Sequence, residues 1–125
     1  MRLLLDTLAL LWALATPDRL SPRARDAIVD GTNEVFVSPA SPWELVIKEA
    51  AGKLQATGDL RAEIDAAAFV ALPITIDHAL AAGALPLHHK DPFDRMLIAQ
   101  ATLESLTIVT RDPRFEPYGV PLLRT

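Results

Sequence analysis

The sequence contains no cysteine among its 125 residues. Disulfide bonds, thiolate metal sites and a cysteine nucleophile are therefore excluded. Apolar runs near the roughly 20 residues of a membrane-spanning helix are also absent, because Asp6 interrupts the hydrophobic stretch at the N-terminus. This N-terminus lacks the cleavage pattern of a signal peptide, so we expect a cytoplasmic protein.

Basic residues are in the minority, with 12 Lys and Arg against 16 Asp and Glu and a net charge of −4. This balance argues against a broad basic surface for nucleic acid, although a local basic patch or a metal ion still suffices to bind phosphate. Half of the residues are hydrophobic, and no repeat, linker or low-complexity segment is present. Such a chain is expected to fold as a single domain over residues 1–125 with a substantial core.

Short hydrophobic segments alternate with helical patterns along the chain. Buried strands are predicted at 2–5, 34–38 and 106–109, an edge strand at 72–74 and a last extended segment at 118–123. Helices are predicted at 8–15, 22–31, 41–52, 60–71, 75–82 and from 92 onward. This alternation predicts an α/β fold, with helices on both faces of a central parallel sheet.

The motif Asp91-Pro92-Phe93-Asp94 predicts the start of an apolar helix. Asp91 suits the N-cap, Pro92 the first helical position and Asp94 the third. The same helical face continues through Leu97, Ile98 and Ala101. A carboxylate at the head of a buried stripe needs a partner, and a metal ion is one candidate.

A second motif, Ser41-Pro42-Trp43-Glu44, repeats this order of cap, proline, aromatic and acid. Ser41 as N-cap and Glu44 three residues later predict a capping box, which by itself would satisfy Glu44. We expect Trp43 to pack in the core and Gly52 to end the helix. The predicted apolar face consists of Trp43, Val46, Ile47 and Ala50.

Four acids stand out by their positions. Asp6 and Asp112 follow hydrophobic strands, whereas Glu44 and Asp94 lie in the first turns of predicted helices. These positions meet at the carboxyl edge of a parallel sheet, where four carboxylates cannot all stay ionised without cations. Oxygen ligands favour Mg²⁺ or Mn²⁺, which activate water for phosphoryl displacement. A cap or a solvated charge explains any single acid more often than a metal does, so the prediction depends on all four together.

Four segments resemble the PIN-domain family, and within it the VapC-type toxins of bacterial toxin–antitoxin pairs. They are Leu3-Leu4-Leu5-Asp6-Thr7, Ser41-Pro42-Trp43-Glu44 with Ile47-Lys48 and Gly52-Lys53-Leu54, Asp91-Pro92-Phe93-Asp94-Arg95-Met96-Leu97-Ile98-Ala99-Gln100-Ala101, and Val109-Thr110-Arg111-Asp112-Pro113-Arg114-Phe115. They follow the family's order and spacing over essentially the whole chain. The resemblance implies a three-layer α/β/α PIN fold and an Mg²⁺- or Mn²⁺-dependent ribonuclease.

The resemblance also implies roles for individual residues. The metal-binding and catalytic quartet is assigned to Asp6, Glu44, Asp94 and Asp112. Within this quartet, Asp6 and Asp94 are the expected direct ligands. Asp91 is secondary and serves chiefly as a cap, while Thr7 and Thr110 are expected to orient neighbouring carboxylates.

One departure from the family is Leu8, which stands where many close relatives have histidine. This histidine is not part of the quartet, so we expect altered RNA or partner contacts without loss of activity. Candidate phosphate contacts near the predicted edge are Lys48, Lys53, Arg95, Arg111 and Arg114. Each is equally an ordinary surface charge, and Lys48 is also spaced for an ion pair with Glu44.

The family resemblance further implies a homodimer and a cognate antitoxin that blocks the site. Apolar helix faces are compatible with both partners, although the core needs such faces anyway. One rival interpretation is an Mg²⁺-dependent phosphatase-like or phospho-acceptor domain, which would need a second acid where Leu8 stands. The other is an inactive PIN-fold interaction protein, against which the intact quartet argues.

Overall fold

The computed structural model describes residues 1–54 and 58–125. The β-strands are β1 (Arg2–Leu5), β2 (Glu34–Val37), β3 (Val70–Ala71), β4 (Thr107–Thr110) and β5 (Leu122–Arg124). The α-helices are α1 (Thr7–Ala15), α2 (Pro22–Val29), α3 (Ala40–Ala50), α4 (Leu60–Ala66), α5 (Ile76–Ala84) and α6 (Pro92–Glu104). Two 3-10 helices, η1 (Pro17–Arg19) and η2 (Pro113–Tyr118), complete the described elements.

The strands form a parallel sheet in the order β3-β2-β1-β4-β5, with β1 at its centre. Leu4 of β1 is in register with Phe36 of β2 on one side and Ile108 of β4 on the other. Leu3, Leu4 and Leu5 are completely buried, as expected for a central strand that helices cover on both faces. The predicted α/β fold with a parallel sheet is therefore confirmed.

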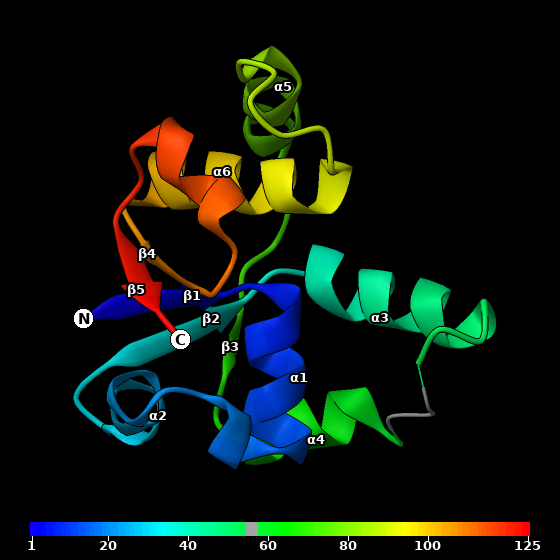
Figure 1. The fold of residues 1–125 in the computed structure, drawn as a ribbon, viewed down its shortest axis with the longest axis vertical. Coiled ribbons are helices and arrows are strands. Elements are labelled where there is room, and N and C mark those ends of the chain that lie inside the picture. Colours follow the sequence, from blue (N-terminus) through cyan, green and yellow to red (C-terminus); the bar gives the residue numbers. More distant parts are fainter. Residues whose placement is uncertain (55–57) are drawn as a thin grey trace.

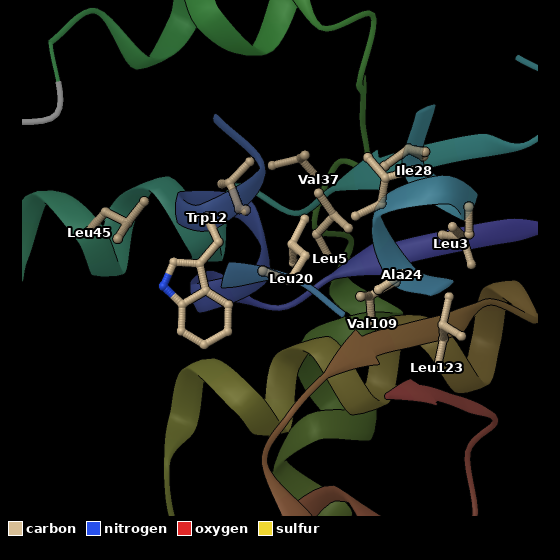
Figure 2. Close-up of a cluster of buried hydrophobic side chains, with 14 residues drawn as sticks. Leu3, Leu5, Trp12, Leu20, Ala24, Ile28, Val37, Leu45, Val109 and Leu123 are labelled. Carbon is tan, nitrogen blue, oxygen red and sulfur yellow. The ribbon is translucent and has the colours of Figure 1, made fainter. Parts of the chain in front are cut away.

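Helices cover the two faces of the sheet in separate groups (Figure 1). On one face, α1 and α2 contribute Trp12 and Ile28 to a core that includes Leu3 of the sheet (Figure 2). On the other face, α6 packs Leu97 against Leu4 and its neighbours. The α3 helix extends beyond the carboxyl ends of β1 and β2 (Figure 1). This is the predicted three-layer arrangement.

Several predicted helix ends are confirmed by their backbone geometry. The side chains of Asp6, Ser21 and Asp91 accept hydrogen bonds at the N-termini of α1, α2 and α6. After α3, Gly52 has a φ of 74°, and its N–H donates to the carbonyl of Glu49 over 3.0 Å. A residue without Cβ adopts this left-handed conformation at little cost, so the helix ends there.

The predicted capping box at the start of α3 is wrong. The helix begins one residue before Ser41, and its N-cap Pro39 makes no side-chain capping hydrogen bond. Ser41 and Glu44 are instead buried within the helix, while Trp43 is 62% exposed. Val46 and Ile47 are exposed as well. The prediction failed because the buried face of α3 carries a serine and an acid, which hydrophobic periodicity assigns to the surface.

Two further boundaries differ from those predicted. The α4 helix ends at Ala66, because Ala68 takes a φ of 59° and reverses the chain before β3. The edge strand therefore lies at Val70–Ala71, not at 72–74. Alanine gives no sequence signal for a left-handed turn, so this stop was not predictable. Among the described helices, none is long and apolar enough to cross a membrane.

Candidate metal and active site

A small pocket of about 140 Å³ lies at the carboxyl edge of the sheet. Its lining comes from the ends of β1 and β4 and from the starts of α1, α3, α6 and η2. The residues that line it are Asp6, Thr7, Leu8, Glu44, Lys48, Asp91, Asp94, Arg111, Asp112 and Arg114. All four predicted acids therefore meet in one pocket, as expected for positions that follow parallel strands.

Asp6 occupies the end of the central strand and is only 7% exposed. Its Oδ1 accepts a hydrogen bond of 2.8 Å from the N–H of Ala9, which caps α1. Its Oδ2 accepts one of 2.6 Å from Oγ1 of Thr110. Burial raises the pKa of Asp6 to about 6, against the lowering effect of these bonds and with the help of nearby acids. Asp6 is thus both a helix cap and a carboxylate that is costly to ionise.

Asp94 lies in the first turn of α6, where Asp91 positions it. The N–H of Asp94 donates to Oδ1 of Asp91 over 2.9 Å, which confirms Asp91 as the cap. Oδ2 of Asp94 lies 2.7 Å from Nε2 of His89. Burial raises the pKa of Asp94 to about 6, although the hydrogen bond from His89 lowers it, and the charge of Asp91 adds to the rise.

The other two acids each have a basic side chain as partner. Glu44 is 6% exposed, and its Oε2 lies 2.8 Å from Nζ of Lys48. Asp112 caps η2, and its Oδ2 lies 2.7 Å from Nη2 of Arg114. The hydrogen bond from Arg114 is the main reason that the pKa of Asp112 is lowered. The quartet therefore divides into two acids paired with a basic side chain, Glu44 and Asp112, and two, Asp6 and Asp94, for which the described part of the chain supplies no Lys or Arg partner.

The chain matches the family model of the PIN domain over residues 3–120. It belongs to the PIN-domain family. A search of curated protein sequences gives no significant match. Family membership is therefore shown by the match to the PIN family model. The four acids of this PIN domain lie at the edge of the sheet where the parallel strands end.

Solved structures share this fold at low sequence identity. A chain of DNA-bound VapBC from Salmonella typhimurium superposes with a TM-score of 0.74 at 18% identity, covering 99% of this chain and 98% of that chain. A chain of VapBC2 from Rickettsia felis, bound to a promoter DNA fragment, gives 0.70 at 16% identity, with coverage of 99% and 98%. VapBC-5 from Mycobacterium tuberculosis, of a toxin-antitoxin family, gives 0.59 at 22%, with coverage of 99% and 98%.

Two threonines orient acids of the PIN domain. Oγ1 of Thr7 donates to Oε1 of Glu44 over 2.6 Å, and Oγ1 of Thr110 donates to Oδ2 of Asp6 over 2.6 Å. Both hydroxyls are buried, so each bond forms without competition from bulk water. These contacts match the orienting roles expected for Thr7 and Thr110.

The predicted basic residues divide between the pocket and the fold. Lys48, Arg111 and Arg114 line the pocket, and Lys53 is exposed outside it. Arg111 already makes hydrogen bonds within the fold, since its Nε donates to the carbonyl of Thr125 and its Nη2 to the carbonyl of Arg19. Its guanidinium also lies 4.5 Å from the centre of the Trp12 ring. Lys48 and Arg114 retain exposed side chains beside the acids.

The structure places Arg95, a predicted RNA contact, away from the pocket. Arg95 is 8% exposed and does not line the pocket. Its Nη2 donates to the carbonyls of Ala82 and Leu85 over 2.9 and 2.8 Å. Its Nη1 donates to those of Pro86 and His89 over 2.9 and 3.2 Å. Arg95 therefore satisfies the carbonyls between the end of α5 and the start of α6.

This role makes Arg95 a stability determinant. We expect Arg95→Lys to lower the free energy of unfolding by about 2–4 kcal/mol, because one ammonium cannot satisfy four carbonyls whose bonds to Arg95 are buried or part-buried. Urea denaturation measures the loss. Arg61→Lys is the control, since Arg61 forms an exposed pair with Asp65 and should change stability by less than about 0.5 kcal/mol. Unchanged stability with weakened RNA binding would instead favour the original prediction.

His89 is a site residue that the sequence analysis missed. It is 6% exposed, and its ring nitrogen contacts Asp94 from the segment just before α6. The available signal was the pair His88-His89, which Lys90 separates from the Asp91 cap. Sequence alone does not reveal which of His88 and His89 turns inward, because the segment has no regular periodicity.

The donor atoms of the PIN-domain pocket fit a divalent cation. Asp6 is buried and Asp94 half-buried, and neither pairs with Lys or Arg among the described residues, a situation that a cation relieves. One donor atom each from His89, Asp94 and Asp112 lies within 4.8 Å of the others. Mostly oxygen donors favour Mg²⁺ or Mn²⁺ over softer metals.

Proposed function

We propose that this PIN domain, spanning residues 1–125, is a divalent-metal-dependent endoribonuclease. The observation that carries the proposal is the pair Asp6 and Asp94, a buried and a half-buried carboxylate in one pocket with raised pKa values and, within residues 1–54 and 58–125, no Lys or Arg partner. Mg²⁺ or Mn²⁺ would be held by these two, with Glu44 and Asp112 completing the set. The ion would acidify water and offset the charge that develops on a phosphodiester.

The side chains of the chain itself supply the remaining parts of this activity. Thr7 and Thr110 hold Glu44 and Asp6 in fixed orientations, so little reorganisation is needed when the cation binds. Lys48 and Arg114 lie at the rim, where positive charge attracts the phosphates that flank the cleaved bond. Leu8 is half-exposed at the same rim and offers an apolar contact in place of a polar one.

We further propose that the protein is the toxin of a toxin–antitoxin pair in the cytoplasm and forms a homodimer. Its fold neighbours are chains of VapBC complexes and of a toxin-antitoxin complex from Klebsiella pneumoniae. Exposed apolar side chains suit a cognate antitoxin and a second copy as partners. They include Leu8, Trp43, Val46 and Ile47 near the pocket, and Ile76 and Leu80 on α5.

The direct test is cleavage of single-stranded and structured RNA by the purified protein. We expect cleavage with Mg²⁺ or Mn²⁺ and none with a chelator, because the acids alone repel phosphate. Cleavage that persists undiminished with the chelator would contradict the metal site. Absence of cleavage with either ion would favour an inactive PIN-fold interaction protein. Growth arrest on induction, relieved by the product of a small neighbouring gene, tests the toxin role separately.

A further inference from the structure

His89 is the one histidine whose ring contacts an acid of the pocket within the described residues. Its Nε2 lies 2.7 Å from Oδ2 of Asp94, and its ring packs edge-on against Phe115 with centroids 6.4 Å apart. Asp94 Oδ1, in contrast, has no hydrogen-bond donor among residues 1–54 and 58–125. One oxygen of Asp94 is therefore fixed by the protein, and the other is left for a ligand.

The backbone of His89 is held as firmly as its ring. Its N–H donates to Oη of Tyr118 over 2.9 Å, and its carbonyl accepts from Nη1 of Arg95 over 3.2 Å. Oη of Tyr118 in turn donates to the carbonyl of Pro86 over 2.7 Å. Arg95 and Tyr118 thus fix an otherwise irregular segment in the position that brings His89 to Asp94.

We propose that His89 is a positioning residue, which donates to Oδ2 of Asp94 and thereby presents this carboxylate to the divalent cation. The inference rests on the proposed function, because it assumes a cation at Asp94. A carboxylate held by a neighbouring donor loses less freedom on binding metal, so removal of the donor weakens binding. This role goes beyond the acidic quartet and explains why buried Arg95 lies next to the site.

Direct ligation by His89 is the competing arrangement. The donor atoms of His89, Asp94 and Asp112 are close enough for a shared ion. However, ligation through Nε2 would break the 2.7 Å bond to Asp94. The observed contacts therefore favour the positioning role.

The experiment measures Mn²⁺ affinity without RNA, by the electron paramagnetic resonance signal of free Mn²⁺. His89→Phe removes the donor, and His89→Gln restores one, because the glutamine amide nitrogen reaches the place of Nε2. His78→Phe is the matched control. His78 is also buried and also pairs with a carboxylate, its Nε2 lying 2.9 Å from Oε1 of Glu104, but outside the pocket.

We expect His89→Phe to weaken Mn²⁺ binding about 10–100-fold, with His89→Gln and His78→Phe within about threefold of the parent. Thermal melting identifies variants that fail to fold. If His89→Phe is among them, His89→Asn carries the same expected loss, because its shorter amide does not reach Asp94. Parental affinity in the donor-free variant would overturn the positioning role and leave the ribonuclease proposal intact. Absence of Mn²⁺ binding by the parent would overturn both.

The hyperfine spectrum of bound Mn²⁺ separates positioning from ligation. We expect no coordinated ¹⁴N signal that depends on His89. A ¹⁴N coupling that disappears in His89→Phe would identify His89 as a ligand and overturn the positioning role. If His89→Gln loses as much Mn²⁺ affinity as His89→Phe, the restored donor is not sufficient, and this result would also overturn the positioning role.

Discussion

Asp94→Asn is expected to reduce metal-dependent RNA cleavage by at least about 100-fold. Asparagine keeps the size of the side chain and one acceptor oxygen, so α6 should fold as before. It removes the negative charge from one of the two acids of the quartet that pair with neither Lys nor Arg among the described residues, His89 being the partner of Asp94. The rate of cleavage of a labelled RNA at saturating Mn²⁺ measures the effect.

Asp91→Asn is the matched control for this substitution. Asp91 lies three residues earlier in the same pocket, but its carboxylate caps α6. Asparagine caps helices about as well as aspartate, so fold and activity should both be kept. If Asp94→Asn cleaves as fast as the parent, or if Asp91→Asn loses as much activity, the assignment of Asp94 as ligand and Asp91 as cap is wrong.

Asp6→Asn is expected to stabilise the metal-free protein at pH 8 by as much as about 3 kcal/mol while removing its activity. Burial raises the pKa of Asp6 from 3.8 to about 6, and each unit of pKa difference corresponds to about 1.4 kcal/mol. Asparagine stays neutral and preserves the local contacts. Its oxygen accepts from the N–H of Ala9, and its amide donates to the hydroxyl of Thr110, which replaces the bonds seen for the acid.

The sign of the pH dependence follows from the raised pKa. Below pH 3.8 Asp6 is protonated in both the folded and the unfolded state, so the two proteins should differ least there. Between pH 3.8 and about 6 the unfolded parent ionises Asp6 whereas the folded parent keeps it protonated, so the parent loses stability relative to Asp6→Asn, and the loss is complete above about pH 6. Urea midpoints with a chelator at pH 4, 6 and 8 measure the difference. A gap that stays constant or shrinks with pH would contradict the raised pKa.

Addition of metal should reverse this order. Mn²⁺ binds the folded parent and stabilises it by mass action, and the gain should be larger at pH 8 than at pH 5 because protons compete for the same carboxylates. Asp6→Asn should gain little at either pH. Equal gains in both proteins would place the cation elsewhere on the molecule.

The parts predicted correctly from the sequence follow local rules. Asp91 was predictable because a cap before an apolar helix depends only on neighbouring residues. Asp6 was predictable for the same reason, since it is a polar residue that ends a buried strand. Their convergence followed from the parallel sheet, since β1 and β4 end at the same edge. Local patterning and sheet topology thus identified the acidic pocket.

The parts that were missed depend on contacts between distant segments. Trp43 was assigned to the core because it is large and apolar, yet the buried face of α3 carries Glu44, which the Thr7 hydroxyl satisfies. Arg95 was taken for a surface charge because its carbonyl partners lie in an irregular segment that sequence does not place. His89 was missed for the same reason. A polar side chain is readily assigned to the surface when its buried partner is unknown.

The hydrogen bond between Thr110 and Asp6 joins residues 104 positions apart. This separation determines when, during synthesis of the chain, the acidic pocket can form. A chain that ends before β4 has Asp6 without its hydroxyl partner and lacks Asp112 altogether. The central strand would also lack its neighbour β4, which is in register with Leu5 at the edge of the pocket. A growing chain therefore carries no assembled site until the ribosome has added β4 and Asp112.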